Sequence, residues 1–153
     1  RQALDGFKVA SFMQKEFPEY FKILTETPVK FCNRDYTQST TRIHYSPLIT
    51  LTKDNDFNII RFSVAYMSIM DCVPEKMDTF YKAYRKFAEL LHDNKFTINF
   101  RLKAGDIFSF NNLRVLHGRT EFNPNSGQRH LQGYYIDRDE IIGRLNFLQK
   151  IDT

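Results

Sequence analysis

The spacing of hydrophobic residues changes several times along this chain of 153 residues, and these changes limit the fold more than any other feature. Apolar residues recur every three or four positions in 75–94, which is the period of an amphipathic helix. Between residues 29 and 62 they alternate with polar residues, as strands do. With 42% hydrophobic and 26% charged residues, the composition is that of a globular domain rather than of a disordered or coiled-coil segment. We therefore expect an α+β fold.

Periodicity and end signals predict four helices. Asp5 is suited to cap the first helix, and Pro18 and Pro74 are suited to the first turns of the second and third. The aromatic face of the third helix is expected to pack in the core rather than to bind a cofactor. The expected helices span residues 6–16, 18–26, 75–94 and 139–150.

Short runs of two-residue alternation predict strands on both sides of the long helix. Asp54-Asn55-Asp56 is a turn signal between two such runs, so a hairpin is expected there, whereas the polar residues 34–38 are expected to form a loop. The expected strand segments are 29–31, 43–45, 48–53, 57–62, 96–102, 107–110 and 129–136.

Charge and cysteine content exclude several classes of protein. The 22 basic and 18 acidic residues give a net charge of +4, but they are interleaved, as in residues 137–140, and form no basic stripe for nucleic acid. No run approaches 18 apolar residues, so no membrane span is expected.

Cys32 and Cys72 match neither a disulfide framework nor a zinc pattern, and we expect two reduced, half-buried thiols. Because the chain starts at Arg1 without a leader sequence, we expect it to begin inside a longer protein.

The densest group of chemically useful residues lies in two segments joined by a polar loop with Asn, Pro and Gly. The first segment contains His117, and the second contains Arg129, Gly133 and Tyr135. If the loop makes the segments antiparallel, His117 and Arg129 lie on neighbouring strands. Positions 129, 133 and 135 share one strand face, so a cation, a gap and an aromatic ring would lie together, which suits a small anionic molecule. Taken singly, His117 is more often structural, Arg129 more often a surface ion-pair partner, and Tyr135 more often a packed residue.

Five motifs together resemble the C-terminal half of the gamma-butyrobetaine dioxygenase group. This group belongs to the taurine dioxygenase-like superfamily of iron(II)- and 2-oxoglutarate-dependent oxygenases. The order and spacing of the motifs hold from about residue 4 to residue 150. The motifs are Asp5-Gly6-Phe7, Val73-Pro74, Gly105-Asp106-Ile107, Asn112-Leu113-Arg114-Val115-Leu116-His117-Gly118-Arg119 and Arg129-His130-Leu131-Gln132-Gly133-Tyr134-Tyr135.

The resemblance implies a fold, a reaction and three site residues. The fold is the C-terminal part of a double-stranded β-helix (jelly roll) with flanking helices, so residues 1–153 would form part of one catalytic domain whose N-terminal part is absent. His117 matches the distant histidine of the iron triad, Arg129 the arginine that pairs with 2-oxoglutarate, and Tyr135 a ring of the trimethylammonium cage. The implied reaction hydroxylates gamma-butyrobetaine to L-carnitine, with ascorbate as an accessory reductant to be tested.

Several features leave alternatives open. No His-x-Asp occurs in the chain, so we expect the first two iron ligands upstream of it and expect the chain alone to be inactive. Leu113 stands where the family usually has Trp, and residues 63–66 lack the family's asparagines, so trimethyllysine dioxygenase activity or a non-catalytic binding module on the same fold are the alternatives. The expected partner is a small quaternary-ammonium substrate, with neither nucleic acid nor membrane. A homodimer and a cytoplasmic location are expected for the full-length protein, with mitochondria as the alternative location.

Overall fold

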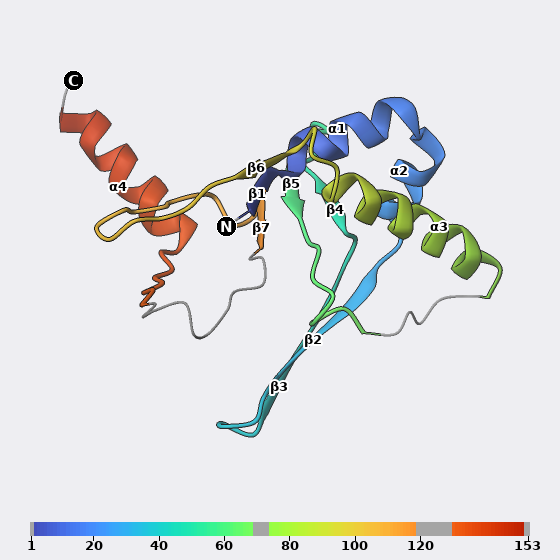
Figure 1. Ribbon diagram of the computed structural model, residues 1–153, viewed down its shortest axis with the longest axis horizontal. Helices are drawn as coiled ribbons and strands as arrows, with labels where there is room; N and C mark the ends of the chain where they lie inside the picture. Colours follow the sequence, from blue (N-terminus) through green and yellow to red (C-terminus); the bar gives the residue numbers. More distant parts are fainter. Residues whose placement is uncertain (1, 69–73, 119–129, 152–153) are drawn as a thin grey trace. The chain divides into compact units, whose positions relative to one another are not determined.

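The computed structural model describes residues 2–68, 74–118 and 130–151 (Figure 1). The chain divides into two compact units, Arg1–Thr120 and Glu121–Thr153. Within the described residues, every strand and the first three helices lie in the first unit, and the second unit contains the last helix. This mixture of helices and strands confirms the predicted α+β class.

The helices begin and end close to the predicted positions. The Asp5 carboxylate accepts a hydrogen bond from the Phe7 N–H at 3.0 Å, which satisfies one of the free donors at the first helix's N-terminus. Pro18 occupies the first turn of the second helix, as predicted. The third helix ends three residues before the predicted boundary. The bounds are α1 Gly6–Glu16, α2 Pro18–Glu26, α3 Pro74–Leu91 and α4 Arg138–Ile151.

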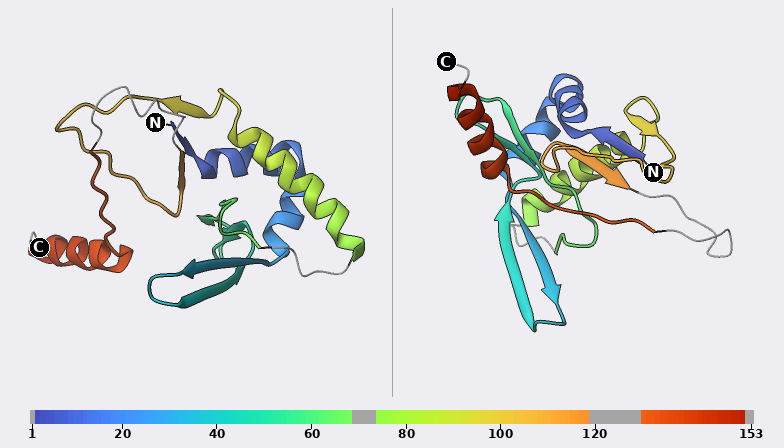
Figure 2. Two further views of the ribbon diagram at one scale, coloured as in Figure 1. Left: turned by 60° about the horizontal axis from the view of Figure 1, so that its bottom comes forward. Right: turned by 90° about the vertical axis from the view of Figure 1, so that its left-hand side faces the viewer.

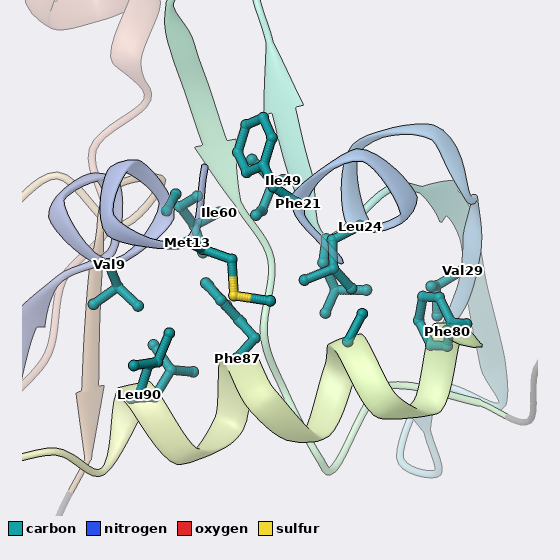
Figure 3. Packing of buried hydrophobic residues seen from close by; sticks show 14 of the residues in the cluster. Val9, Met13, Phe21, Leu24, Val29, Ile49, Ile60, Phe80, Phe87 and Leu90 are labelled. Carbon is teal, nitrogen blue, oxygen red and sulfur yellow. The ribbon is translucent and has the colours of Figure 1, made fainter. Parts of the chain in front are cut away.

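The hydrophobic core of the first unit forms where α3 packs against α1 and α2. Figure 3 shows Phe87 and Leu90 of α3 pointing toward Val9 and Met13 of α1, while Phe80 lies near Val29, which follows α2 in the sequence. Phe87, Met13 and Val9 are fully buried, which confirms that the aromatic face of α3 packs in the core. The other cluster members are Ala10, Phe21, Leu24, Leu48, Ile49, Ile60, Ala83, Leu91 and Phe96.

Seven strands form three small antiparallel sheets in the described part of the chain. One sheet has the strand order β6-β1-β7, and the other two are the hairpins β2-β3 and β4-β5. Figure 2 shows β2 and β3 as a long two-stranded ribbon. The bounds are β1 Gln2–Asp5, β2 Val29–Asp35, β3 Thr40–Ser46, β4 Ile49–Leu51, β5 Phe57–Ile60, β6 Thr97–Asn99 and β7 Val115–Gly118.

The two hairpins test the predicted turns. The pairing of β4 with β5 confirms the hairpin expected around the turn, where Asn55 has a left-handed φ of 63°. The loop expected at residues 34–38 starts later than predicted, because Arg34 and Asp35 extend β2 and pair with Thr41 and Thr40. The Asp35 carboxylate then accepts hydrogen bonds from the N–H groups of the next turn, which is where the chain reverses.

The strands predicted at 48–53 and 57–62 are shortened to β4 and β5, and all three strands predicted after α3 are shortened or wrong. Of residues 96–102, β6 keeps only three, and residues 107–110 form no strand. Residues 130–136 also form no strand, and residue 129 lies outside the described residues. Alternation alone therefore overestimated strand content, since a strand also needs a neighbour to satisfy its backbone groups.

Two further predictions concern membrane spans and thiols. Across the described residues, no helix combines the length and the apolar character needed to cross a bilayer. Cys32 is a free, half-buried thiol, as predicted. Cys72 lies outside the described residues.

Candidate functional site

His117 lies on β7, and the pairing of β7 with β1 determines which face of the sheet carries it. Ala3 of β1 is opposite His117 on one side and opposite Ile98 of β6 on the other. Directly opposite residues in antiparallel strands share a face, so these three side chains lie on one face of the sheet. Leu4 and Leu116 are the neighbouring opposite pair, and both pack against the core. His117 therefore lies on the face away from the core, and its side chain is exposed.

The ring of His117 contacts an aromatic series. The centroids of Phe110 and His117 are 4.7 Å apart and their rings are tilted by 57°. Phe110 also contacts Phe108 at 4.8 Å, and Phe108 contacts Phe100 at 4.7 Å. One side of the imidazole is thus covered by an aromatic ring, which limits the rotation of the His117 side chain.

A compact turn brings the chain from Phe110 into β7. The Asn111 side-chain oxygen accepts a hydrogen bond from the Leu113 N–H at 3.0 Å. The Asn111 carbonyl accepts from Arg114 at 3.0 Å and from Val115 at 2.9 Å. Asparagine favours such turns because its side chain can bond to the backbone two residues on. The turn places Phe110 and His117, seven residues apart, against one another.

Asp5 and Arg114 form a bidentate ion pair at the start of β7. Arg114 Nε donates to Asp5 Oδ1 at 3.0 Å, and Nη2 donates to Oδ2 at 2.6 Å. The hydrogen bonds from Arg114 are the main reason that the pKa of Asp5 lies below its ordinary value of 3.8. Partial burial opposes this shift, while the charge of Arg114 and backbone N–H groups of Phe7 and Lys8 support it. The same pair raises the pKa of the Arg114 guanidinium.

The backbone at the start of α1 also lies close to the backbone just before β7. The Gly6 N–H donates to the Arg114 carbonyl at 2.9 Å, and the Arg114 guanidinium lies 5.3 Å from the Phe7 ring centroid. A Cβ on Gly6 would lie 2.7 Å from that carbonyl oxygen and 3.0 Å from Ile60 Cγ1. Glycine is therefore needed here for space, because a side chain would separate the start of α1 from the start of β7.

The His117 imidazole could occupy one coordination position of a metal ion. An exposed imidazole on a strand can donate a ring nitrogen to iron. Among the described residues, no group of three His, Cys, Asp or Glu side chains is close enough to hold a metal ion. The assignment of His117 as a metal ligand stays a prediction.

The other two predicted site residues are Arg129 and Tyr135, whose placement beside His117 stays a prediction. Arg129 lies outside the described residues, so the expected pairing of its strand with that of His117 stays a prediction. Tyr134 and Tyr135 belong to the second unit, where both side chains are exposed, at 83% and 88%. A strand at residues 129–136 would place Tyr134 and Tyr135 on opposite faces. That expected strand is wrong for the described residues, because 130–137 have no regular structure.

Sequence reasoning missed two features of this site. The strand β1 precedes the first predicted helix and was not expected, since four residues carry too little periodicity to be recognised. The Asp5–Arg114 pair was also missed, although both residues belong to the motifs that carry the resemblance. Their separation of 109 residues offers no local signal.

Comparisons with known proteins agree with the resemblance. A model of the taurine catabolism dioxygenase TauD, TfdA family matches residues 2–135. Gamma-butyrobetaine dioxygenase from a Pseudomonas species (strain AK-1) is 37% identical over 147 residues, which cover 96% of this chain and 38% of that protein. The Homo sapiens protein of the same name is 31% identical, covering 97% and 39%. Trimethyllysine dioxygenase from Meyerozyma guilliermondii is also 31% identical, covering 95% and 36%.

These matches cover enough of this chain to show its family, but too little of its relatives to show the activity of a whole protein. The chain spans less than two fifths of the length of each of these relatives. The family model, however, covers most of the chain and includes β1, His117 and the segment up to Tyr135. The chain therefore belongs to the taurine catabolism dioxygenase TauD, TfdA family.

Proposed function

We propose that this chain is the C-terminal part of a dioxygenase that hydroxylates gamma-butyrobetaine to L-carnitine with iron(II), O2 and 2-oxoglutarate. The observation that carries the proposal is the 37% identity to a gamma-butyrobetaine dioxygenase across 96% of the chain. We propose further that residues 1–153 contribute to one catalytic domain with the jelly-roll fold. The location would be the cytoplasm, with mitochondria as the alternative, and the full-length protein would be a homodimer.

His117 is proposed as one of three iron ligands. A coordinating imidazole must be neutral. The Phe110 ring, whose centroid lies 4.7 Å from that of His117, limits the orientations that the His117 side chain can take. The remaining two ligands, a His-x-Asp pair, would come from residues upstream of this chain. With iron bound, the centre would activate O2, the oxidant that is used both for the decarboxylation of 2-oxoglutarate to succinate and for the hydroxylation of an aliphatic C–H bond.

Arg129 and Tyr135 are proposed to orient the two organic molecules. The planar guanidinium of Arg129 would form two parallel hydrogen bonds with the distal carboxylate of 2-oxoglutarate. The ring of Tyr135 would face the trimethylammonium group, which cannot donate a hydrogen bond and is attracted by an aromatic face. Both contacts gain strength when the assembled site excludes water, and this requires the exposed Tyr135 to become covered. Ascorbate is proposed as an accessory reductant.

Trimethyllysine is the second candidate substrate. It is favoured by the 31% identity to a trimethyllysine dioxygenase and by residues 63–66, a serine, a valine, an alanine and a tyrosine, where the resemblance leads one to expect asparagines. Both candidates are small quaternary-ammonium compounds, so the proposed cage at Tyr135 suits either.

The test compares turnover of both substrates by the longest polypeptide that contains this sequence. We expect carnitine formation that depends on iron(II) and 2-oxoglutarate, and its loss in His117→Ala. His44→Ala removes another exposed histidine, from β3, and is expected to have no effect. Hydroxylated trimethyllysine in place of carnitine would favour the second candidate. Absence of turnover and of metal binding would favour a non-catalytic module. The 153-residue chain alone is expected to be inactive, since one imidazole competes poorly with water for iron(II).

A further inference from the structure

The described part of the first unit holds His117 on a very short strand. β7 has four residues, and its pairing with β1 runs from Asp5–Val115 to Gln2–Gly118. The side-chain period of a strand is two, so a slip of one residue between β1 and β7 would turn His117 toward the core and Leu116 away from it. A short ladder offers few contacts against such a slip, and a metal ligand tolerates none. Packing of Leu116 against the core opposes such a slip, and contacts outside the ladder add to this effect.

Arg114, the residue immediately before β7, makes three separate contacts with the β1–α1 junction. Its guanidinium forms the bidentate pair with Asp5, its carbonyl accepts from the Gly6 N–H, and its side chain lies over the Phe7 ring. These three partners are consecutive in the chain. A slip by one residue moves β7 by about 3.3 Å along β1 and would break all three contacts together.

From this geometry we propose that the Asp5–Arg114 pair is a positioning device for His117, which sets the register of β7 and hence the sheet face that carries the iron ligand. The inference depends on the proposed function, because it takes His117 as a ligand. Asp5 shares the strand face of Ala3, which is opposite His117, so the carboxylate is also a diagonal neighbour of the ligand across the ladder.

Because the Asp5–Arg114 pair is partly exposed, its effect on the position of His117 can be measured apart from its small effect on stability. The side chains of Arg114 and Asp5 are 50% and 33% exposed. Exposed ion pairs contribute about 0–1 kcal/mol to stability. Removing the pair should thus change the geometry at His117 much more than the melting temperature.

Asp5→Ser is the informative variant because it separates the two tasks of Asp5. Serine is as good an N-cap for α1 as aspartate, but its side chain is too short to pair with Arg114. Arg114→Lys keeps the positive charge and loses the planar fork, which makes it an independent second variant. Asp78→Asn breaks the exposed pair with Lys82, whose atoms are also 2.6 Å apart, and is the matched control on α3.

The measurement is the affinity of the longest polypeptide containing this sequence for cobalt(II), followed by its visible absorption. We expect Asp5→Ser and Arg114→Lys to weaken cobalt(II) binding about tenfold, at the lower end of the range for residues that orient metal ligands. Asp78→Asn should bind as the wild type does, and all three variants should melt within a few degrees of it. In the metal-free protein, the NMR signal of the His117 Cε1–H should move in Asp5→Ser, because the Phe110 ring no longer lies in the same place relative to it.

Each result has a distinct consequence. If His117→Ala abolishes cobalt(II) binding while Asp5→Ser and Arg114→Lys leave it unchanged, the positioning inference is wrong and the proposed function stands. If both variants lose affinity only in proportion to a loss of folded protein, the pair is merely structural and the inference is again wrong. If His117→Ala binds cobalt(II) as tightly as the wild type, the proposed role of His117 fails, and the inference fails with it.

Discussion

Gly6→Ala tests the close approach of α1 to β7 directly. The added Cβ would lie 2.7 Å from the Arg114 carbonyl oxygen and 3.0 Å from Ile60 Cγ1, whereas ordinary contacts lie at 3.4–4 Å. The helix start and the carbonyl must therefore separate by about 0.7 Å. This movement also lengthens the hydrogen bond from the Gly6 N–H, now 2.9 Å, to the same carbonyl.

The expected free-energy change combines opposing effects. Overpacking of a close contact typically costs about 1–3 kcal/mol, and weakening the hydrogen bond adds a fraction of about 1 kcal/mol. Alanine gains up to about 1 kcal/mol over glycine within a helix, but less at the first helical residue. We expect a net loss of about 1–2 kcal/mol in the free energy of unfolding. At a urea dependence of about 2 kcal/mol per M, this lowers the urea midpoint by roughly 0.5–1 M.

Gly143→Ala in α4 is the matched control. Beyond its chain neighbours and the backbone of its own helix, no atom of the described residues lies within 4 Å of a Cβ built at Gly143. The residue is inside a helix, so we expect a gain of about 0.5–1 kcal/mol in local helix stability. Urea unfolding followed by far-UV circular dichroism measures both variants. A Gly6→Ala protein as stable as the wild type, or more stable, would show that the junction yields freely and would refute the steric argument.

Four further predictions follow from the same residues and from the proposed function. Arg129→Ala should raise the KM for 2-oxoglutarate at least about 30-fold with poor rescue by Lys, because loss of one partner of a desolvated pair costs about 2–5 kcal/mol; an unchanged KM would reassign Arg129 to a surface ion pair. Tyr135→Leu should raise the substrate KM roughly 30-fold while uncoupled 2-oxoglutarate consumption continues, whereas Tyr134→Leu, at a position that the resemblance does not assign to the cage, changes neither; a lowered melting temperature with an unchanged KM would make Tyr135 a packing residue. The pKa of Asp5 is lowered, so its stabilising effect is complete above pH about 4 and is lost as the pH falls through the folded-state pKa; acid unfolding of Asp5→Asn should lack this component, and identical acid curves would count against the pair. Phe87→Ala should cost about 3–5 kcal/mol in urea unfolding, because Phe87 is fully buried between α3 and α1; a loss below about 1 kcal/mol would mean that this core is not formed.

The helices were predictable because their signals are local. Asp5 before α1, Pro18 within the first turn of α2 and the three-and-four spacing in α3 all act within a few residues of where they stand. The β4–β5 hairpin was predictable for the same reason, since Asn55 tolerates the left-handed φ that its turn requires.

The failed strand at 107–110 shows what alternation cannot distinguish. Phe108 and Phe110 alternate with polar residues, as strand residues would, but their rings contact Phe100 and His117 instead of lining a paired ladder. The same apolar spacing therefore serves side-chain packing without backbone pairing. Only the presence of a neighbouring strand separates the two cases, and a single sequence does not contain that information.

Asp5 illustrates the corresponding limit for the site. Its helix-capping role depends on Phe7, two residues away, and was predicted correctly from the sequence. Its pairing with Arg114 depends on a contact 109 residues away, and no periodicity links the two positions. Because one carboxylate serves both, the residue that begins α1 is also the one that holds the start of β7. The local motif around His117 is thus only half of what places that imidazole on the sheet face away from the core, and the other half is near the start of the first unit's sequence.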